Sequence, residues 1–435
     1  MSIPPGSDGL PLLGETLAFA KNPFGFIDER LARHGRVFRT NVLGRKAAVI
    51  AGPDAAGTFI DPDAIERAGA MPPHVREIFG GDSLPLLDRD IHRSRKTLVM
   101  SAFSRAALTS YLPEMQRIVE RAFAAWSRSG EIRWLDEMKR LSIEVICTNV
   151  FGMKAGAEMD QLRSDYETLT RGFATLPINL PGTTFNRALK ARDRIFAVLR
   201  SRIRERSVTP TEDGLSRILA NRGETSNDEI MLELHHIVIA GFIVFAEFAA
   251  MVQELTANNA VRMRLTTEIR SKSPEGAIAV EALMSMPYLL QVVNEVKRIC
   301  PIVAAVFGKS KGFTIDGMTV PPGWMVMWAV TPSHNARGLY SDPAKFDPDR
   351  FSPERAEEKR HEHAFAPQGA GPATGHRCPG LDYATFFMEV FAIVLLRSHS
   401  WELPPQNFAL DFSRTPPELK DGLRAKVVAV TDKGA

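Results

Sequence analysis

Cysteine is scarce in this sequence, and the few cysteines have no paired spacing. The chain has 435 residues and three cysteines, Cys147, Cys300 and Cys378. An odd number of cysteines without Cys-x-x-Cys spacing offers neither a disulfide framework nor a structural zinc site. A reducing compartment fits best, so we expect a cytoplasmic protein.

An excess of one charge and a membrane-length apolar run are also lacking. Lys and Arg number 54 against 51 Asp and Glu, a net charge of +3, and the charges are scattered, which argues against a nucleic-acid partner. The most apolar stretch, 237–252, contains Glu247 and is shorter than the roughly 18 residues that a membrane span needs. The N-terminus has no basic segment followed by an apolar core. We therefore expect no membrane span, no signal peptide and a long helix buried in the protein.

The remaining pattern predicts one large domain, 1–435, without repeats or linkers. Residues 36–41 and 46–50 predict a hairpin, 310–330 return to strand character, and 340–377 indicate an irregular coil. Helical periodicity is found over 106–127, 135–150, 183–206, 227–258, 283–299 and 381–398. We expect a mainly α fold with small β-sheets (α+β). Its β-rich edge would come from 1–60, 302–335 and 400–435, and its helical core from 90–300 and 378–398.

Cys378 stands out because of its surroundings. It lies in FAPQGAGPATGHRCPGLDYA, 365–384, whose glycines let the backbone turn tightly and approach a flat ligand. The helix predicted just after it would present N–H groups that favour a thiolate and hydrogen-bond a metal-bound sulfur. Two alternatives are an inert buried thiol and a phosphate-binding loop at GAGPATG. The latter should follow a strand, whereas a charged coil precedes it here.

The order of several charged residues makes the pattern specific. Glu295 and Arg298 lie three apart on a predicted helix, which alone is typical of a solvated surface pair. Arg350 follows in FDPDRF, and then Cys378 and Gly380 as Cys-x-Gly. In this order and spacing the sequence resembles the cytochrome P450 family over nearly its whole length. The resemblance implies the P450 fold and one haem b (iron protoporphyrin IX) with Cys378 as the iron ligand. It also implies that Glu295, Arg298 and Arg350 form a charge cluster behind the haem.

The same resemblance assigns further residues to the haem. His92, in HRSRKTLVMSAF, matches a position that contacts a haem propionate, with Lys96 in place of the usual arginine. Lys309, in VFGKSK, is a second propionate candidate. Ordinary surface charge is the alternative for these three residues. The expected cofactor-binding set also includes Phe365, His376 and Gly380.

The cysteine loop departs from the usual family pattern, Phe-x-x-Gly-x-Arg-x-Cys-x-Gly. Phe365 lies thirteen positions before Cys378, and Arg377 directly precedes the cysteine. Through PQGAG and TGHRCPG the loop is similar to that of the bacterial fatty-acid peroxygenase branch, whose members use hydrogen peroxide. Those enzymes carry an arginine near Ala240 and Gly241 that pairs with the substrate carboxylate. Because this chain lacks it, a carboxylate there would be buried without a partner.

The helix expected over the haem departs as well. Oxygen-activating family members carry Ala-Gly-x-Asp/Glu-Thr, whereas this chain has Ala240-Gly241-Phe242-Ile243-Val244. Ile243 and Val244 replace the acid and the alcohol, so these side chains cannot relay protons. Glu247, one turn beyond Ile243, either replaces the acid or is a structural group bonded to a neighbouring helix; we favour the structural role.

A substrate pocket is also implied. The run LPINLPG within 173–192 predicts a loop between helices, similar to the lid of P450s that act on sterols, retinoids and terpenoids. The alternative is a turn with no bearing on substrate. The expected pocket consists of Leu176 from this lid, Ile302, Val303, and Ala240, Gly241, Phe242, Ile243 and Val244.

We therefore expect a haem-thiolate monooxygenase that oxidises a hydrophobic, terpenoid or steroid-like molecule. It would use O2 and electrons from ferredoxin and ferredoxin reductase, and it would act as a monomer. Two alternative activities stay open: an H2O2-dependent peroxygenase and a redox-neutral isomerase or dehydratase. The alternative outside enzymes is a haem-binding ligand sensor.

Overall fold

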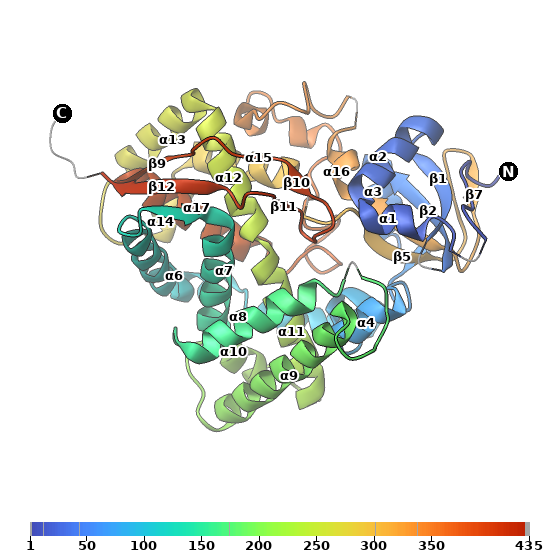
Figure 1. Cartoon of the computed structure of the whole chain (residues 1–435), viewed down its shortest axis with the longest axis horizontal. Helices are drawn as coiled ribbons and strands as arrows, with labels where there is room; N and C mark the ends of the chain where they lie inside the picture. The colour runs from blue at the N-terminus through green and yellow to red at the C-terminus, as the bar shows by residue number, and fades with distance from the viewer. Residues whose placement is uncertain are drawn as a thin grey trace.

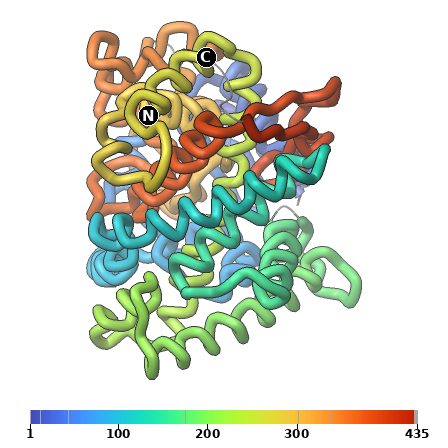
Figure 2. Tube along the Cα trace, turned by 90° about the vertical axis from the view of Figure 1, so that its left-hand side faces the viewer, coloured from blue at the N-terminus to red at the C-terminus, as the bar shows by residue number. Residues whose placement is uncertain are grey.

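The computed structural model describes residues 2–11, 13–42, 44–173, 175–300, 302–336 and 338–430. Helices make up most of the molecule, and a sheet containing β1, β2 and β5 lies at one side, near the N-terminus (Figure 1). In the side view, the green helices of the middle of the chain form the lower edge, and the red C-terminal segments lie above them (Figure 2). This arrangement is the predicted mainly α fold with small sheets.

The long helices follow the apolar periodicity of the sequence. They are α6 (Arg105–Trp126), α7 (Trp134–Phe151), α8 (Ala157–Thr170), α9 (Thr184–Val208), α13 (Asn259–Lys272), α15 (Pro287–Ile299) and α17 (Leu381–Ser398). The shorter ones are α1 (Thr16–Lys21), α2 (Pro23–His34), α3 (Pro53–Ile60), α4 (Pro73–Phe79), α5 (Arg89–Ser101), α10 (Gly214–Ala220), α14 (Val280–Met284) and α16 (Val330–His334). Helix α15 begins at Pro287 and not at the predicted residue 283. Proline is favoured at the first helical position, so the helix does not extend to the residues before it.

The helix predicted over 227–258 is two helices, α11 (Asn227–Ile243) and α12 (Phe245–Ala257). At Val244 the backbone tightens, and the Glu247 N–H bonds the Val244 carbonyl at 2.9 Å, three residues back. The stretch Asn227–Ala257 is long and apolar enough to cross a membrane, but 72% of its most apolar window is buried inside the protein. Its hydropathy is therefore explained by the core, as the sequence predicted.

Two regions of sheet lie on different sides of the molecule (Figure 1). The larger sheet has the order β1 (Val37–Val42), β2 (Arg45–Ala51), β8 (Met325–Ala329), β5 (Val306–Ser310) and β3 (Ile65–Glu66). Only its β2–β8 pair is parallel. A second sheet joins β4 (Glu131–Arg133), β12 (Arg424–Ala429) and β9 (His399–Glu402). Two hairpins are β6 (Phe313–Ile315) with β7 (Met318–Val320) and β10 (Leu410–Asp411) with β11 (Glu418–Leu419).

The prediction of one β-rich edge is corrected by this topology. Residues 1–60 and 302–335 do share a sheet, but the strands of 400–430 pair with β4 and with one another. Residues 431–435 lie outside the described residues. The C-terminal strand β12 therefore pairs with β4, which precedes α7, and the C-terminal segment does not extend the N-terminal sheet.

The predicted lid is shorter than 173–192. A loop without helix or strand runs from 171 to 183, with Ala174 outside the described residues, and α9 already begins at Thr184. Thr183 caps that helix, since its side-chain oxygen accepts a hydrogen bond from the Asn186 N–H at 3.2 Å. The coil predicted over 340–377 holds only two short 3-10 turns, Pro348–Phe351 and Glu357–Lys359.

Candidate functional site

The loop before α17 presents the Cys378 sulfur to a cavity. The Cys378 N–H donates to the Gln368 carbonyl at 2.9 Å, which closes the loop. Gly369 and Gly371 have φ of 95° and 85°, the left-handed region that glycine adopts without strain. Burial raises the pKa of the Cys378 thiol, while a hydrogen bond from the Gly380 N–H and the charges of Lys96 and Lys297 lower it. The Gly380 N–H therefore favours the thiolate, the form of Cys378 that would bind iron.

The cavity above this sulfur has a volume of about 950 Å³. Its walls come from α1, α4, α5, α11, the lid loop and residues 303–307, with Cys378 and Pro379 on one side. Most of the lining side chains are apolar. Among the described residues, no group of three or more His, Cys, Asp or Glu could hold a metal ion by itself. A metal here would need further ligands from a cofactor.

Polar groups gather beside the Cys378 loop. The His92 and His376 rings lie with centroids 4.0 Å apart and planes tilted by 32°, and both residues line the cavity with Lys96 and Arg67. Burial and the nearby Lys96 charge lower the pKa of His92 to about 4. The His92 Nε2 atom is buried without a hydrogen-bond partner in the described part of the chain.

These groups fit the haem that the sequence implies. Two cations and an unpaired imidazole nitrogen beside the thiol suit the two propionates of a haem whose iron is bound by Cys378. Lys96 donates to the Arg377 carbonyl and so also steadies the loop. Arg67, which was not predicted, follows the two-residue strand β3, and its backbone N–H is held by Asp88 at 3.0 Å. No local motif marks Arg67.

Three predicted haem residues do not line the cavity: Gly380, whose N–H faces the Cys378 sulfur instead, and Lys309 and Phe365. Lys309 points away on β5, where its Nζ forms an ion pair of 2.6 Å with Glu66. The Phe365 ring lies behind the loop, with its centroid 5.0 Å from that of Phe351. Neither residue lines the cavity. The prediction is corrected for Lys309 and Phe365. The pairing of β3 with β5 places Lys309 beside Glu66, and the longer loop places Phe365 against Phe351.

The predicted charge cluster is assembled in the core. Arg298 donates to both Glu295 oxygens, at 2.7 and 2.9 Å, and Arg350 donates to Glu295 at 3.0 Å. The three side chains are fully buried. Glu357 adds a second carboxylate, 3.0 Å from Arg350. Burial raises the pKa of Glu357, but hydrogen bonds from Arg355 and Ser341 outweigh it and hold the value at about 2. Because its charges are paired, the cluster can lie in the core and fix the coil before the cysteine loop.

Lys297 is a further buried cation that sequence reasoning missed. It lies between Glu295 and Arg298, and its Nζ donates to Thr385 at 2.8 Å and to the Leu381 carbonyl and Gln368 side chain at 3.4 Å. It therefore links α15 to the first turn of α17 and to the cysteine loop. In the sequence, a lysine next to an arginine is typical of a charged surface. Its burial follows only from the packing of α15, α17 and the cysteine loop around it.

The substrate side of the cavity was predicted only in part. Leu176, Val303 and Ile243 line it, whereas Ala240, Gly241, Phe242, Val244 and Ile302 do not. Gly241 faces Ile146 of α7, and Phe242 packs on Phe245 with ring centroids 5.4 Å apart. The cavity face of α11 consists instead of His236, Ile239 and Ile243. These positions are three and four apart, as one helix face requires.

Glu247 does not have the expected structural bond. Its side chain is buried in α12, and neither carboxylate oxygen has a hydrogen-bond partner in the part of the chain that is described. Burial raises its pKa, against an opposing effect of the Lys297 charge. Glu247 does not line the cavity, so it does not stand in for the missing acid there.

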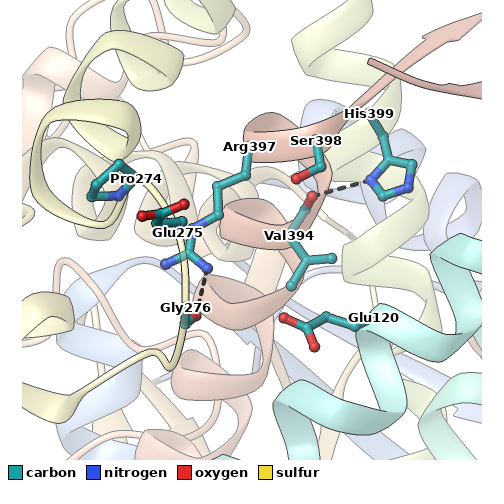
Figure 3. A pocket seen from close by; sticks show the side chains of 8 residues that line it. All are labelled: Glu120, Pro274, Glu275, Gly276, Val394, Arg397, Ser398 and His399. Carbon is teal, nitrogen blue, oxygen red and sulfur yellow. Dashed lines mark hydrogen bonds between the residues drawn. The ribbon is translucent and has the colours of Figure 1, made fainter. Parts of the chain in front are cut away.

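A second, shallower depression of about 230 Å³ lies elsewhere, where α6 meets the end of α17 (Figure 3). Arg397 spans it and donates to the Gly276 carbonyl at 2.9 Å, and His399 contacts the Val394 carbonyl at 3.3 Å. These polar groups hold the loop after α13 against α17. The depression is a structural junction and holds none of the chemistry of the Cys378 cavity.

Comparison with known proteins gives the same family throughout. Residues 4–422 match the family model described as Cytochrome P450. "Putative cytochrome P450 120" of Synechocystis is 32% identical over 98% of this chain and 97% of its own length. "Abscisic acid 8'-hydroxylase 2" of Arabidopsis thaliana is 27% identical over 99% of this chain and 90% of its own length.

Solved structures agree with these matches. "Retinoic acid bound cyanobacterial CYP120A1" has a TM-score of 0.91 at 31% identity and covers 99% of this chain and 100% of its own. A mutant of "Cytochrome P450SP alpha (CYP152B1)" shares the fold, with a TM-score of 0.81 at 24% identity over 96% of this chain and 99% of its own. The matches confirm the predicted fold and the predicted oxidoreductase class. The chain belongs to the cytochrome P450 family of haem-thiolate proteins.

Proposed function

We propose that the protein is a monooxygenase that binds haem b and oxidises a hydrophobic isoprenoid molecule. The observation that carries the proposal is the large, mostly apolar cavity that Cys378 lines together with Ile239 and Ile243. The names of two relatives contain retinoic acid and abscisic acid, and both of these compounds are isoprenoids. We further propose that it uses O2 and electrons from a ferredoxin and its reductase, and that it is a cytoplasmic monomer.

One set of residues would bind the cofactor, and another would contact the substrate. When bound, a thiolate-ligated haem supplies the oxidising power to insert oxygen into a C–H or C=C bond. Cys378 would ligate the iron, while His92, Lys96, His376 and Arg67 would hold the propionates. The apolar walls of the cavity exclude water and align the substrate with the haem. The Ile243 side chain has no exchangeable proton, so protons would come from water or from the substrate itself.

Labelled oxygen provides the test of this activity. Purified holoprotein is given retinoids, ferredoxin, its reductase and isotopically heavy O2, and products are analysed by mass spectrometry. We expect the heavy atom in the product. We also expect Cys378→Ala to lose both the product and the thiolate-type absorption band of the reduced carbon-monoxide complex. A normal band with no oxygenated product under any condition would contradict the proposal and favour a ligand sensor.

A peroxide-driven reaction is the second candidate, because Ile243 leaves the cavity without an acid that could deliver protons for the reduction of O2. Hydrogen peroxide already contains those protons. In a parallel assay, H2O2 replaces the ferredoxin system, with and without O2. Faster product formation with H2O2 alone would make the protein a peroxygenase. Product isomerised or dehydrated without any oxidant would show redox-neutral chemistry.

A further inference from the structure

The part of the cavity farthest along α11 from Ile243 is an aromatic compartment that contains one polar ring. Phe79 of α4 and Phe173 of the lid stack with centroids 5.5 Å apart and planes at 18°. His236 of α11 also lines the cavity, with its centroid 6.4 Å from that of Phe79. It lies two helical turns before Ile243 on the same face. A substrate that extends along this face of α11 would therefore have one end beside His236.

His236 is unpaired, unlike its neighbour. The preceding residue, His235, contacts Tyr166 through Nδ1 and the Ile78 carbonyl through Nε2, both at 3.3 Å. The His236 Nδ1 is buried without a partner, and no hydrogen bond from the described residues holds its Nε2. The other histidine of this compartment, His74, is held by the Phe173 backbone. A buried polar group left unpaired is energetically costly, and a suitable ligand group would recover that cost.

The charge around His236 determines which ligand group is suitable. Burial, together with the Lys96 charge, lowers the pKa of His236 to about 4, so its imidazole is neutral at pH 7. A neutral imidazole offers one donor and one acceptor nitrogen. The lysine and arginine that line the cavity, Lys96 and Arg67, lie by the Cys378 loop with His92 and His376. Lys96 is the cation whose charge acts on His236, and with haem bound it would be paired with a propionate, so a carboxylate at His236 would be buried without a free cation, whereas a hydroxyl or carbonyl group would be satisfied.

We propose that His236 anchors the substrate through a neutral oxygen atom, so that the preferred ligands are isoprenoid alcohols or carbonyl compounds rather than isoprenoid acids. The proposal rests on the function proposed above only in taking this cavity as the substrate site. The proposed ligands differ from the retinoic acid bound to the cyanobacterial relative, which is a carboxylic acid. Retinol, retinoic acid and deoxyretinol, the parent hydrocarbon, are matched probes because they share one carbon skeleton.

The experiment measures the dissociation constant of each probe from the shift of the haem spectrum, without electron donors. In the wild type, we expect retinol to bind about fivefold to tenfold more tightly than retinoic acid and deoxyretinol, which corresponds to about 1 to 1.4 kcal/mol, the net contribution of one hydrogen bond. His236→Phe keeps a ring in place and should weaken retinol binding about fivefold to tenfold while leaving deoxyretinol unchanged. His236→Gln should restore part of the loss.

Two controls separate the anchor from packing and from misfolding. His74→Phe alters the other histidine of the compartment and should keep the preference for retinol. The carbon-monoxide band of each variant verifies its fold and haem loading. The proposal is overturned if no retinoid binds, if retinoic acid binds as tightly as retinol, or if His236→Phe weakens deoxyretinol and retinol equally. If retinol binds in preference to the other two probes but no oxygenated product is ever found, only the proposed function is contradicted, because this binding measurement involves no turnover.

Discussion

At the scale of single residues, the cavity face of α11 is determined by three side chains rather than by a contiguous motif. Ile243 reaches the cavity, but Val244 is packed in the main core at the junction of α11 and α12. The two apolar replacements therefore have different consequences. The missing acid leaves the cavity without a proton carrier, whereas the missing alcohol is a change within the core.

Ile243→Asp should improve the use of O2. A positioned acid can contribute about 10²-fold or more to a proton-limited step, so we expect the ratio of product formed to O2 consumed to rise several-fold. The measurement compares product with oxygen uptake in the ferredoxin system. Val244→Thr is the control and should give no gain, because position 244 faces the core. Unchanged coupling in Ile243→Asp would show that protons come from the substrate or that O2 is not the oxidant.

Lys297 provides a second prediction at this scale. Its ammonium group lies beneath the cysteine loop, so it favours electron density on the thiolate side and raises the reduction potential of the bound haem. Lys297→Met should lower that potential by about 50 mV, equivalent to about 1 kcal/mol. Lys297→Arg keeps the charge and should leave the potential close to that of the wild type. Spectroelectrochemical titration measures both, and equal potentials in all three proteins would argue against the effect.

At the scale of elements, the close approach of α11 to α7 depends on Gly241. A Cβ atom at position 241 would lie 2.7, 3.0 and 3.1 Å from three side-chain carbons of Ile146. These distances are shorter than ordinary van der Waals contact, and both helices are held by core packing on either side. The glycine therefore sets the spacing between α7 and α11, and through it the position of the cavity face.

Gly241→Ala should destabilise the protein although alanine favours helix. Overpacking costs about 1–3 kcal/mol and outweighs the helix propensity gain of about 1 kcal/mol, so the thermal midpoint should fall. Ile146→Val removes one methyl group from the contact, and the double variant should recover part of the loss. A double-mutant cycle measures this coupling. Purely additive changes would mean that the strain is relieved elsewhere.

At the scale of the whole molecule, buried neutral histidines link stability to pH. Burial lowers the pKa of His235 to about 3 and that of His334 to about 4 from the ordinary value near 6.5. Below pH 6.5 the unfolded chain binds protons at these positions while the folded chain does not. Their contribution is therefore complete above pH 6.5 and is lost as the pH falls towards 4.

Each of these histidines should reduce the free energy of unfolding by about 2 kcal/mol between pH 8 and pH 5. Thermal midpoints measured across this range should fall accordingly. His334→Gln retains an acceptor for the Ala366 N–H, which His334 accepts at 3.0 Å, and should flatten the pH dependence. Parallel curves for His334→Gln and the wild type would contradict the linkage.

Prediction from sequence succeeded where chemistry and spacing are local. Glu295 and Arg298 lie one helical turn apart, and Cys378 with Gly380 directly precedes α17, so short motifs were sufficient. Arg67 reaches the cavity only because β3 pairs with the distant strand β5. The contiguous motif 240–244 predicts the wrong face of α11 for every residue except Ile243, because one helix face presents residues that are three and four apart. Counting back from Ile243 by three or four residues would have indicated Ile239 and His236.

The pairing of β2 has a consequence for synthesis of the chain. The hairpin of β1 and β2 can form as soon as residue 51 leaves the ribosome, but β8, the parallel neighbour of β2, ends at residue 329. Until then Ala47, Ala48, Val49 and Ile50, all fully buried in the native protein, would form an open apolar edge. Nascent chains are thus exposed to mispairing for most of translation, and a chaperone that covers this edge should increase the yield of folded protein.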